Sequence, residues 1–344
     1  MKGLKSFLKF ILFLGIGLLI LYLLYTNLDA AYQKECVVKG IPADQCSFKD
    51  KLINDFKSVK IFWILLVCVI FMFSNLCRAL RWNQFLATLG HRPKIINSLG
   101  AVMIAYVTNL AIPRLGEIVR AGTLKKYEDI PLEHSVGTIV LDRLLDVISL
   151  LIAIGLAFLL SFNTFQTYIE QEGGLSPNTL YILLFLGLAG LVSLFFFDRF
   201  IRATESDNKL IIKLKSLWSG FREGILSIKK VKNIPLLLFY SVSIWVSYYL
   251  MTYLCFFAFV PTENLSALAG LVVFVFGSLG IVFPAPGGMG SYQWLVSQAL
   301  IIYGINEFDA FSFSNIIFLS INIICNVLFG FLFLLVLPIY NSKN

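Results

Sequence analysis

The sequence predicts an all-α polytopic membrane protein, and three observations support this fold class. Hydrophobic residues make up 58% of the 344 residues and charged residues only 14%, whereas soluble domains average about 45–50% and about 25%. Mean hydropathy is +0.83. Several apolar runs are long enough to cross a bilayer as helices. We expect residues 1–344 to form a single integral membrane domain, because no polar stretch is long enough to build a separate core.

About six apolar runs are predicted to span the membrane fully. The first follows three lysines and lacks the cleavage site of a secretory signal, so we interpret it as a retained anchor. The second ends in Arg78, Arg81 and Trp82 and leads into a basic loop. The six runs are Phe7–Tyr25, Ile61–Leu80, Ser135–Leu160, Thr179–Phe197, Ile234–Phe257 and Phe313–Leu337.

Two further apolar segments are interrupted, and we predict that each is a re-entrant helical hairpin. Residues 95–126 are broken at Pro113, and residues 265–303 are broken at Pro284 and Pro286. A single crossing by 95–126 would place the nine Lys and Arg residues of 198–233 outside, whereas re-entry leaves them inside, as the positive-inside rule favours. The two hairpins then enter from opposite faces, which is typical of inverted-repeat transporters, although no residue-level repeat is evident.

The charge distribution predicts how the chain is oriented in the cytoplasmic membrane. The formal net charge is +8, but the basic residues cluster at the ends of apolar segments, which favours membrane orientation over nucleic-acid binding. We expect both termini to be cytoplasmic and residues 26–60 to form an extracytoplasmic polar loop. Residues 198–233 are expected to form a basic cytoplasmic segment, as an amphipathic surface helix or a plain connecting helix.

Cysteine and histidine residues give few indications of chemistry. Cys36 and Cys46 lie in the first polar loop, where they form a disulfide if that loop faces an oxidising space, or remain two free thiols if it does not. The other cysteines lie in apolar runs and are expected to pack. Neither His91 nor His134 has a ligand cluster around it, so we expect no metal site, and we expect no cofactor.

Charged residues within apolar segments mark the candidate site. Each ionised group at the centre of a membrane helix costs about 2.5–3.5 kcal/mol, so these groups must pair, face water or meet a polar ligand. The half-helix after Pro113 carries its charges three residues apart on one face, and its N-terminal end is a natural anion site. Asn109 could satisfy the backbone freed at this break. The six residues are Arg114, Glu117, Arg120, Asp142, Arg143 and Asp146.

Two interpretations of these six residues stay open, and both can hold together. One is an internal salt-bridge lattice, since three arginines balance three carboxylates to a net charge of zero. The other is a substrate path or proton relay, because buried ionisable residues in membranes are usually functional.

The second break also has two interpretations. Gly287, Gly288 and Gly290 permit left-handed backbone and close approach, so that exposed N–H groups there could hold an anionic or hydroxylated head group. The alternative is a tight turn inside a buried hairpin. Gln293 offers a polar edge beside this break.

Three motifs together resemble a known family. They are N-x-x-x-P-R-x-G-E-x-x-R-A at 109–121, D-R-x-x-D at 142–146 and P-G-G-x-G at 286–290. The pattern resembles the flippase-like membrane domain of the lysylphosphatidylglycerol synthase family, the membrane half of the multiple peptide resistance factor. One departure is Gln293, where the family often has glutamate. The matching positions are Asn109, Pro113, Arg114, Gly116, Glu117, Arg120, Arg143, Gly287, Gly288 and Gly290.

The resemblance implies movement of a phospholipid or lipid-linked phosphate head group between leaflets. The expected partner is therefore a membrane lipid with an anionic or phosphate head group, and a homodimer is compatible with this function. We expect no enzymatic activity, because the family's aminoacyl-transfer domain and any nucleotide-binding loop are absent. The alternatives are an intramembrane enzyme that uses Glu117 or Asp142, and a membrane scaffold that transports nothing.

Overall fold

The computed structural model describes residues 2–42, 46–112, 115–164, 166–167, 230–282 and 285–342, and its regular elements in these ranges are all helical. The all-α prediction is therefore confirmed. The predicted span 179–197 and the basic segment up to residue 229 lie outside the described residues, as do Pro113, Arg114 and Pro284. The helices are α1 Lys2–Val38, α2 Phe48–Lys57, α3 Ile61–Thr88, α4 Ile95–Ala111, α5 Leu115–Glu128, α6 Leu132–Leu160, α10 Ile234–Phe256, α11 Ala267–Val282, α12 Ser291–Ile302, α13 Glu307–Ile317 and α14 Asn326–Asn341, with 3₁₀ turns η3 Val260–Thr262 and η4 Pro286–Gly288.

Five helices within the described ranges are long and apolar enough to cross a membrane, and they match five of the six predicted spans. They are α1, α3, α6, α10 and the continuous helix Glu307–Asn341, in which a π-helical segment, Phe318–Cys325, joins α13 to α14. The shortest has 23 residues, which corresponds to about 35 Å at 1.5 Å per residue and exceeds the hydrocarbon core of a bilayer.

The first interrupted segment is a tight antiparallel pair of helices, α4 and α5. The start of α4 and the end of α5 lie together, because the backbone N–H of Lys94 donates to Glu128 Oε1 at 2.8 Å. At the inner end, Asn109 Oδ1 accepts a hydrogen bond from the backbone N–H of Gly116 at 2.7 Å, so the side chain satisfies a donor that the break leaves free. A Cβ on Gly116 would lie 2.3 Å from the Ala105 carbonyl oxygen, so the two helices approach closely only because this residue is glycine.

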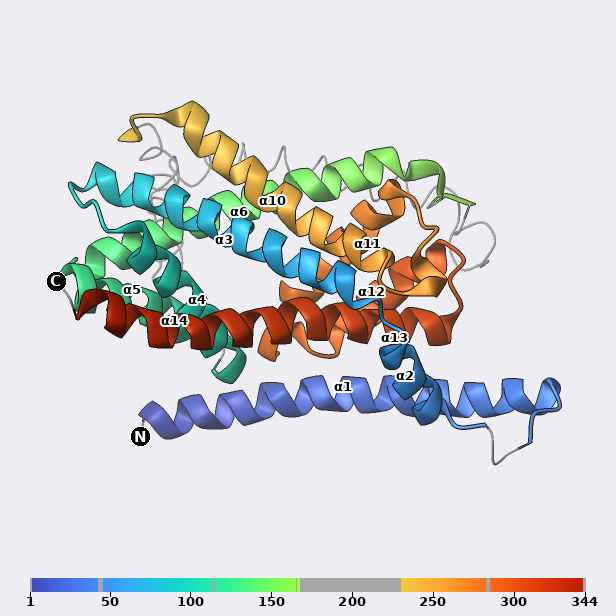
Figure 1. Cartoon of the computed structure of the whole chain (residues 1–344). Helices are drawn as coiled ribbons and strands as arrows, with labels where there is room; N and C mark the ends of the chain where they lie inside the picture. The colour runs from blue at the N-terminus through green and yellow to red at the C-terminus, as the bar shows by residue number, and fades with distance from the viewer. Residues whose placement is uncertain are drawn as a thin grey trace, which may run out of the picture.

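The second interrupted segment, α11 and α12, opens at the opposite end of the bundle (Figure 1). The long helix connects the two ends: α13 packs on α12, whereas α14 packs on α4 and ends with Asn341 bonded to Asn97. The inner ends of the hairpins meet, since a Cβ on Gly287 would lie 3.6 Å from Leu110 Cδ2. The structure thus contains two hairpins that point toward each other, while both chain termini lie at the end where the first hairpin opens (Figure 1).

The predicted polar loop 26–60 is mostly helical, which corrects the sequence-based boundary. Helix α1 continues to Val38, because polarity alone does not end a helix and no glycine or proline occurs between Gly17 and Gly40. Helix α2 then begins at the N-cap Ser47, whose side chain accepts from the Asp50 N–H at 3.2 Å.

Helix α2 attaches α1 to the bundle through apolar and ionic contacts. Phe48 is fully buried among aromatic rings of α1 and α13, including Tyr32 and Phe308. Lys51 Nζ lies 2.6 Å from Asp55 Oδ2 and 2.7 Å from Asp309 Oδ1, which links α2 to α13. The same end of α1 carries a disulfide between Cys36 and Cys46, so of the two alternatives for these cysteines the bonded one is confirmed.

Replacing both Cys36 and Cys46 with serine is expected to lower the free energy of unfolding of this region by about 2–3 kcal/mol, because a short closed ring no longer restricts the unfolded chain. Chemical denaturation in detergent, monitored by proteolysis between α1 and α2, would measure the change. A reductant should destabilise the wild type equally and leave the double variant unchanged. An effect below 0.5 kcal/mol in the variant would contradict the prediction.

Candidate functional site

The polar site lies between α3, α5, α6 and α10 and is organised by two arginines of α3. Arg78 and Arg81 are spaced one turn apart, and their side chains are 2% and 0% exposed. The apolar pattern predicts that they lie at the end of a span, but α3 continues to Thr88, which brings both inside the bundle. Buried guanidinium groups require partners, because an unpaired buried charge is strongly destabilising.

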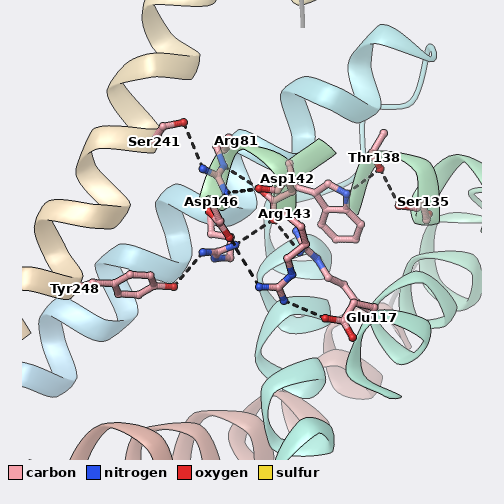
Figure 2. Close-up of polar contacts among 12 residues, drawn as sticks. Arg81, Glu117, Ser135, Thr138, Asp142, Arg143, Asp146, Ser241 and Tyr248 are labelled. Carbon is pink, nitrogen blue, oxygen red and sulfur yellow. Dashed lines mark hydrogen bonds and ion pairs between the residues drawn. The ribbon is translucent and has the colours of Figure 1, made fainter. Parts of the chain in front are cut away.

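Two aspartates of α6 supply those partners and form a closed lattice with the α3 arginines (Figure 2). Arg81 Nε donates to Asp142 Oδ1 at 2.8 Å, and Arg81 Nη2 donates to Asp146 Oδ1 at 2.7 Å. Arg78 Nη1 donates to Asp146 Oδ2 at 2.7 Å and to Asp142 Oδ2 at 3.2 Å. Helix α10 completes the shell, because Tyr248 accepts from Arg78 and Ser241 accepts from Arg81. This half of the site is the predicted salt-bridge lattice, held by different arginines from those expected.

Arg120 of α5 is buried in the same cluster but is only partly bonded. Its Nη1 donates to Asp142 Oδ2 at 3.0 Å, and its guanidinium carbon lies 3.9 Å from the centroid of the Trp82 ring. Trp82 is fixed in turn by donation from Nε1 to Thr138 Oγ1 at 2.9 Å. Among the described residues, the buried Nε and Nη2 atoms of Arg120 have no hydrogen-bond partner. Because buried donors are normally satisfied, these two N–H groups are the donors that a hydrogen-bond acceptor would satisfy.

Arg143 and Glu117 form the accessible side of the site. Arg143 Nη2 lies 3.3 Å from Glu117 Oε1, and their side chains are 42% and 34% exposed. A second contact of Arg143, Nη1 to Asp146 Oδ2, measures 3.8 Å. Within the described ranges, Glu117 Oε2 and Arg143 Nε have no hydrogen-bond partner. This pair is therefore held less tightly than the lattice, and either side chain can turn to a ligand without breaking the α3–α6 contacts.

The site carries an excess of positive charge, which corrects the predicted balance of zero. Among the described residues, four arginines face three carboxylates, a difference of +1 when all are ionised. Arg114 would add another positive charge, but its position lies outside the described residues. An excess of guanidinium groups, one of them with free N–H groups, favours an anionic ligand. The four arginines are Arg78, Arg81, Arg120 and Arg143, and the carboxylates are Glu117, Asp142 and Asp146.

The second break uses its polar groups within its own turn. Gly287, Gly288 and Gly290 have φ angles of 62°, 75° and 87°, which confirms their predicted left-handed conformation. The N–H of Gly288 donates to the Ala285 carbonyl at 2.9 Å, and the N–H of Gly290 donates to Gln293 Oε1 at 2.8 Å. Because these two donors are occupied, the described contacts favour the tight-turn interpretation. Head-group binding at this break stays a prediction.

The structure thus separates the predicted site residues into three groups. Glu117, Arg120, Asp142, Arg143 and Asp146 come together in one cluster. The other residues support the two breaks: Asn109 holds the first, and Gly287, Gly288, Gly290 and Gln293 shape the second.

Sequence reasoning missed Arg78 and Arg81. Their i, i+3 spacing on an otherwise apolar helix, matching that of Glu117 and Arg120, was the available signal.

Comparison with known proteins agrees with this architecture. The family described as "Lysylphosphatidylglycerol synthase TM region" matches residues 49–336. The chain is 26% identical over 227 residues to the UPF0104 membrane protein MJ1078 of Methanocaldococcus jannaschii, covering 65% of this chain and 91% of that protein. It is 25% identical over 264 residues to the UPF0104 membrane protein PH1989 of Pyrococcus horikoshii, covering 71% and 78%. No solved structure matches significantly. The chain therefore belongs to the family of lysylphosphatidylglycerol synthase transmembrane regions, as a multi-pass, all-helical membrane protein.

Proposed function

We propose that this protein moves a lipid with an anionic, phosphate-bearing head group between the leaflets of the cytoplasmic membrane. The observation that carries the proposal is Arg120, whose buried Nε and Nη2 atoms have no partner inside a cluster of net positive charge. A phosphate oxygen is an acceptor that matches a guanidinium fork, and charge-assisted hydrogen bonds of this kind are the strongest that side chains form.

The division of the site into a closed and an open half supports a binding cycle. Arg78 and Arg81 keep Asp142 and Asp146 in place, so the frame persists when a ligand enters or leaves. The phosphate binds Arg120 and draws Arg143 away from Glu117, while the acyl tails stay in the surrounding lipid. When Glu117 binds Arg143 again, the head group is released. Glu117 thus competes with the phosphate for the guanidinium group of Arg143.

The arrangement of the hairpins in the membrane is part of the proposal. We place the open end of the first hairpin and both termini on the cytoplasmic side, because Lys94, Lys125 and Lys126 lie at that end and positive charge favours it. Both hairpins then enter from opposite faces without crossing, and irregular backbone at membrane depth is acceptable where it is buried in protein or lines a cavity. The lipid path runs past the accessible pair Arg143 and Glu117.

Substituting Arg120 with lysine is expected to reduce lipid movement at least tenfold, even though the positive charge is kept. Lysine can replace the single contact with Asp142 but not the planar stack on Trp82 or the two free N–H groups, and a lost charge-assisted bond is worth about 1.5–3 kcal/mol. The measurement is head-group-selective movement of labelled phosphatidylglycerol, phosphatidylcholine and a polyprenyl phosphate in reconstituted liposomes. Lys125→Gln is the matched control, since Lys125 lies on the same helix and pairs with Asp129 on the exposed face.

Three results would contradict this function. Wild-type rates in folded Arg120→Lys and Arg120→Gln would show that the free guanidinium donors are not used. Recovery of chemically altered lipid would instead support an intramembrane enzyme, whereas unchanged lipid is expected. Absence of movement in well-folded wild type, with every lipid and with an imposed ion gradient, would favour the scaffold hypothesis.

A further inference from the structure

A pocket of about 480 Å³ opens at the end of the bundle where the first hairpin begins and ends, away from the arginine cluster. It lies between the start of α4 and the last turns of α5 and α14. Its lining residues are Lys94, Lys126, Tyr127, Pro338, Asn341 and Ser342. The pocket therefore joins three elements that are far apart in the sequence.

The walls of this pocket are fixed by a partly buried amide network. Asn97 and Asn341 exchange two hydrogen bonds, with Nδ2 to Oδ1 distances of 3.0 and 2.8 Å. Glu128 Oε1 accepts from Asn97 Nδ2 at 2.6 Å and from the Lys94 backbone N–H at 2.8 Å. The Glu128 carboxylate is therefore directed into the wall, where it accepts hydrogen bonds from amide N–H groups and not from an ammonium group.

The two ammonium groups of the pocket are left without a carboxylate. Within the part of the chain that the structure describes, neither Lys94 nor Lys126 has an ion pair, whereas the neighbouring Lys125 pairs with Asp129 at 2.5 Å. Each ammonium group lies beside an aromatic ring: Lys94 Nζ is 5.5 Å from the Tyr340 centroid and Lys126 Nζ is 4.9 Å from the Tyr127 centroid. The C-terminal ends of α5 and α14 attract cations here, but carbonyl dipoles do not neutralise two full charges.

We propose that this pocket is a second anion site, and that it binds the phosphate of an anionic phospholipid head group or a free phosphate ion. Two lysines that line one pocket and an aromatic rim at the end of a membrane bundle are the elements by which proteins hold phosphorylated head groups at a membrane surface. The volume accommodates a glycerophosphate group. This site does not depend on the proposed transport, because it shares no residue with the arginine cluster.

Binding would connect the two arms of the first hairpin with the end of α14. Lys94 is the N-cap of α4, Lys126 lies in the last turn of α5, and Asn341 lies in the last turn of α14. A phosphate held by the two lysines therefore stabilises the contacts among these three elements and raises the thermal stability of the protein, since a ligand that binds only the folded state shifts unfolding.

The test measures the melting temperature of purified protein in a neutral detergent. One arm adds mixed micelles of phosphatidylglycerol or phosphatidylcholine, and the other adds inorganic phosphate or an equal concentration of chloride. We expect phosphatidylglycerol to stabilise the wild type. Its apparent Kd should be about fivefold weaker in Lys94→Gln or Lys126→Gln and about 25-fold weaker in the double variant, because each lysine contributes separately to the binding free energy of the phosphate. Lys125→Gln is the matched control and should bind as the wild type does.

Further variants distinguish binding at this pocket from binding at the arginine cluster and from a folding defect. The same titrations in an Arg120→Gln background exclude binding at the arginine cluster, and the lysine-dependent component must persist there. Lys94→Arg with Lys126→Arg should retain binding and excludes a folding defect as the cause. Stabilisation by inorganic phosphate alone would assign the site to a soluble anion. No lysine-dependent stabilisation in either arm, or equal stabilisation by phosphatidylcholine, would overturn the proposal.

Discussion

Arg81→Met is expected to lower the free energy of unfolding by about 3–5 kcal/mol, because removing one partner of a buried ion network leaves uncompensated charge. Arg81 is fully buried and holds both Asp142 and Asp146 through short contacts. Methionine fills similar volume, so the loss reports the charge rather than a cavity. Thermal or chemical unfolding in detergent, with the monodisperse fraction as a second readout, would measure it. Arg143→Met, at a side chain 42% exposed, should cost less than about 1 kcal/mol.

A double variant separates lattice energy from packing. When Asp146→Leu is added to Arg81→Met, one charge of each sign is removed, so the double variant should be more stable than the sum of the two single effects by about 1–3 kcal/mol. Strict additivity would mean that the two side chains do not interact. Equal stability of Arg81→Met and Arg143→Met would show that the lattice is not the structural frame of the site.

Gly116→Ala is expected to destabilise the first hairpin by about 1–3 kcal/mol, although alanine is normally the better helix former. The added Cβ would lie 2.3 Å from the Ala105 carbonyl oxygen and 2.6 Å from Asn109 Cγ, so α4 and α5 must move apart. The Asn109 bond to the Gly116 N–H is then stretched, and Arg120 one turn later shifts from Asp142. The prediction is a lower melting temperature together with a loss of lipid movement.

Gly122→Ala is the matched control on the same helix. No atom lies within 4 Å of a Cβ at Gly122, so alanine there should stabilise the protein by about 0.5–1 kcal/mol through helix propensity alone. The two substitutions are chemically identical and their expected effects have opposite sign. A stabilising effect of Gly116→Ala would contradict the close approach of the two helices.

Most of the fold could be predicted because apolar run lengths and breaks are local properties of the sequence. The runs that became α3, α6 and α10 were recognised, and proline and glycine marked the positions where both hairpins are interrupted. The end of α1 was misplaced, since residues 26–38 include several polar side chains but no glycine or proline that would end the helix. Polarity predicts exposure to water and not the end of a helix.

The candidate site could be predicted only in part, because partner choice depends on packing between distant segments. Asp142 and Asp146 were identified from their cost inside an apolar helix, but Arg78 and Arg81 were assigned to the membrane surface. A basic residue near the end of an apolar run fits either location. The length of the helix decides between these two locations. Helix α3 extends to Thr88, ten residues past Arg78, so the arginines do not lie at its end.

The π-helical segment Phe318–Cys325 interrupts the regular α-helical winding of the long C-terminal helix between α13 and α14. A π turn contains an additional residue, and moving that residue along the helix by one turn changes the azimuth of everything beyond it while few hydrogen bonds are exchanged. The segment lies where the two hairpins meet: a Cβ on Gly287 would lie 3.5 Å from Phe318 Cζ, and Cys325 Sγ lies 3.5 Å from Cys68 Sγ of α3. Beyond this segment α14 packs on α4 and bonds Asn97 through Asn341, whereas α13 on its other side packs on α12. The π-helical segment therefore lies between the two stretches of one continuous helix that hold the two hairpins.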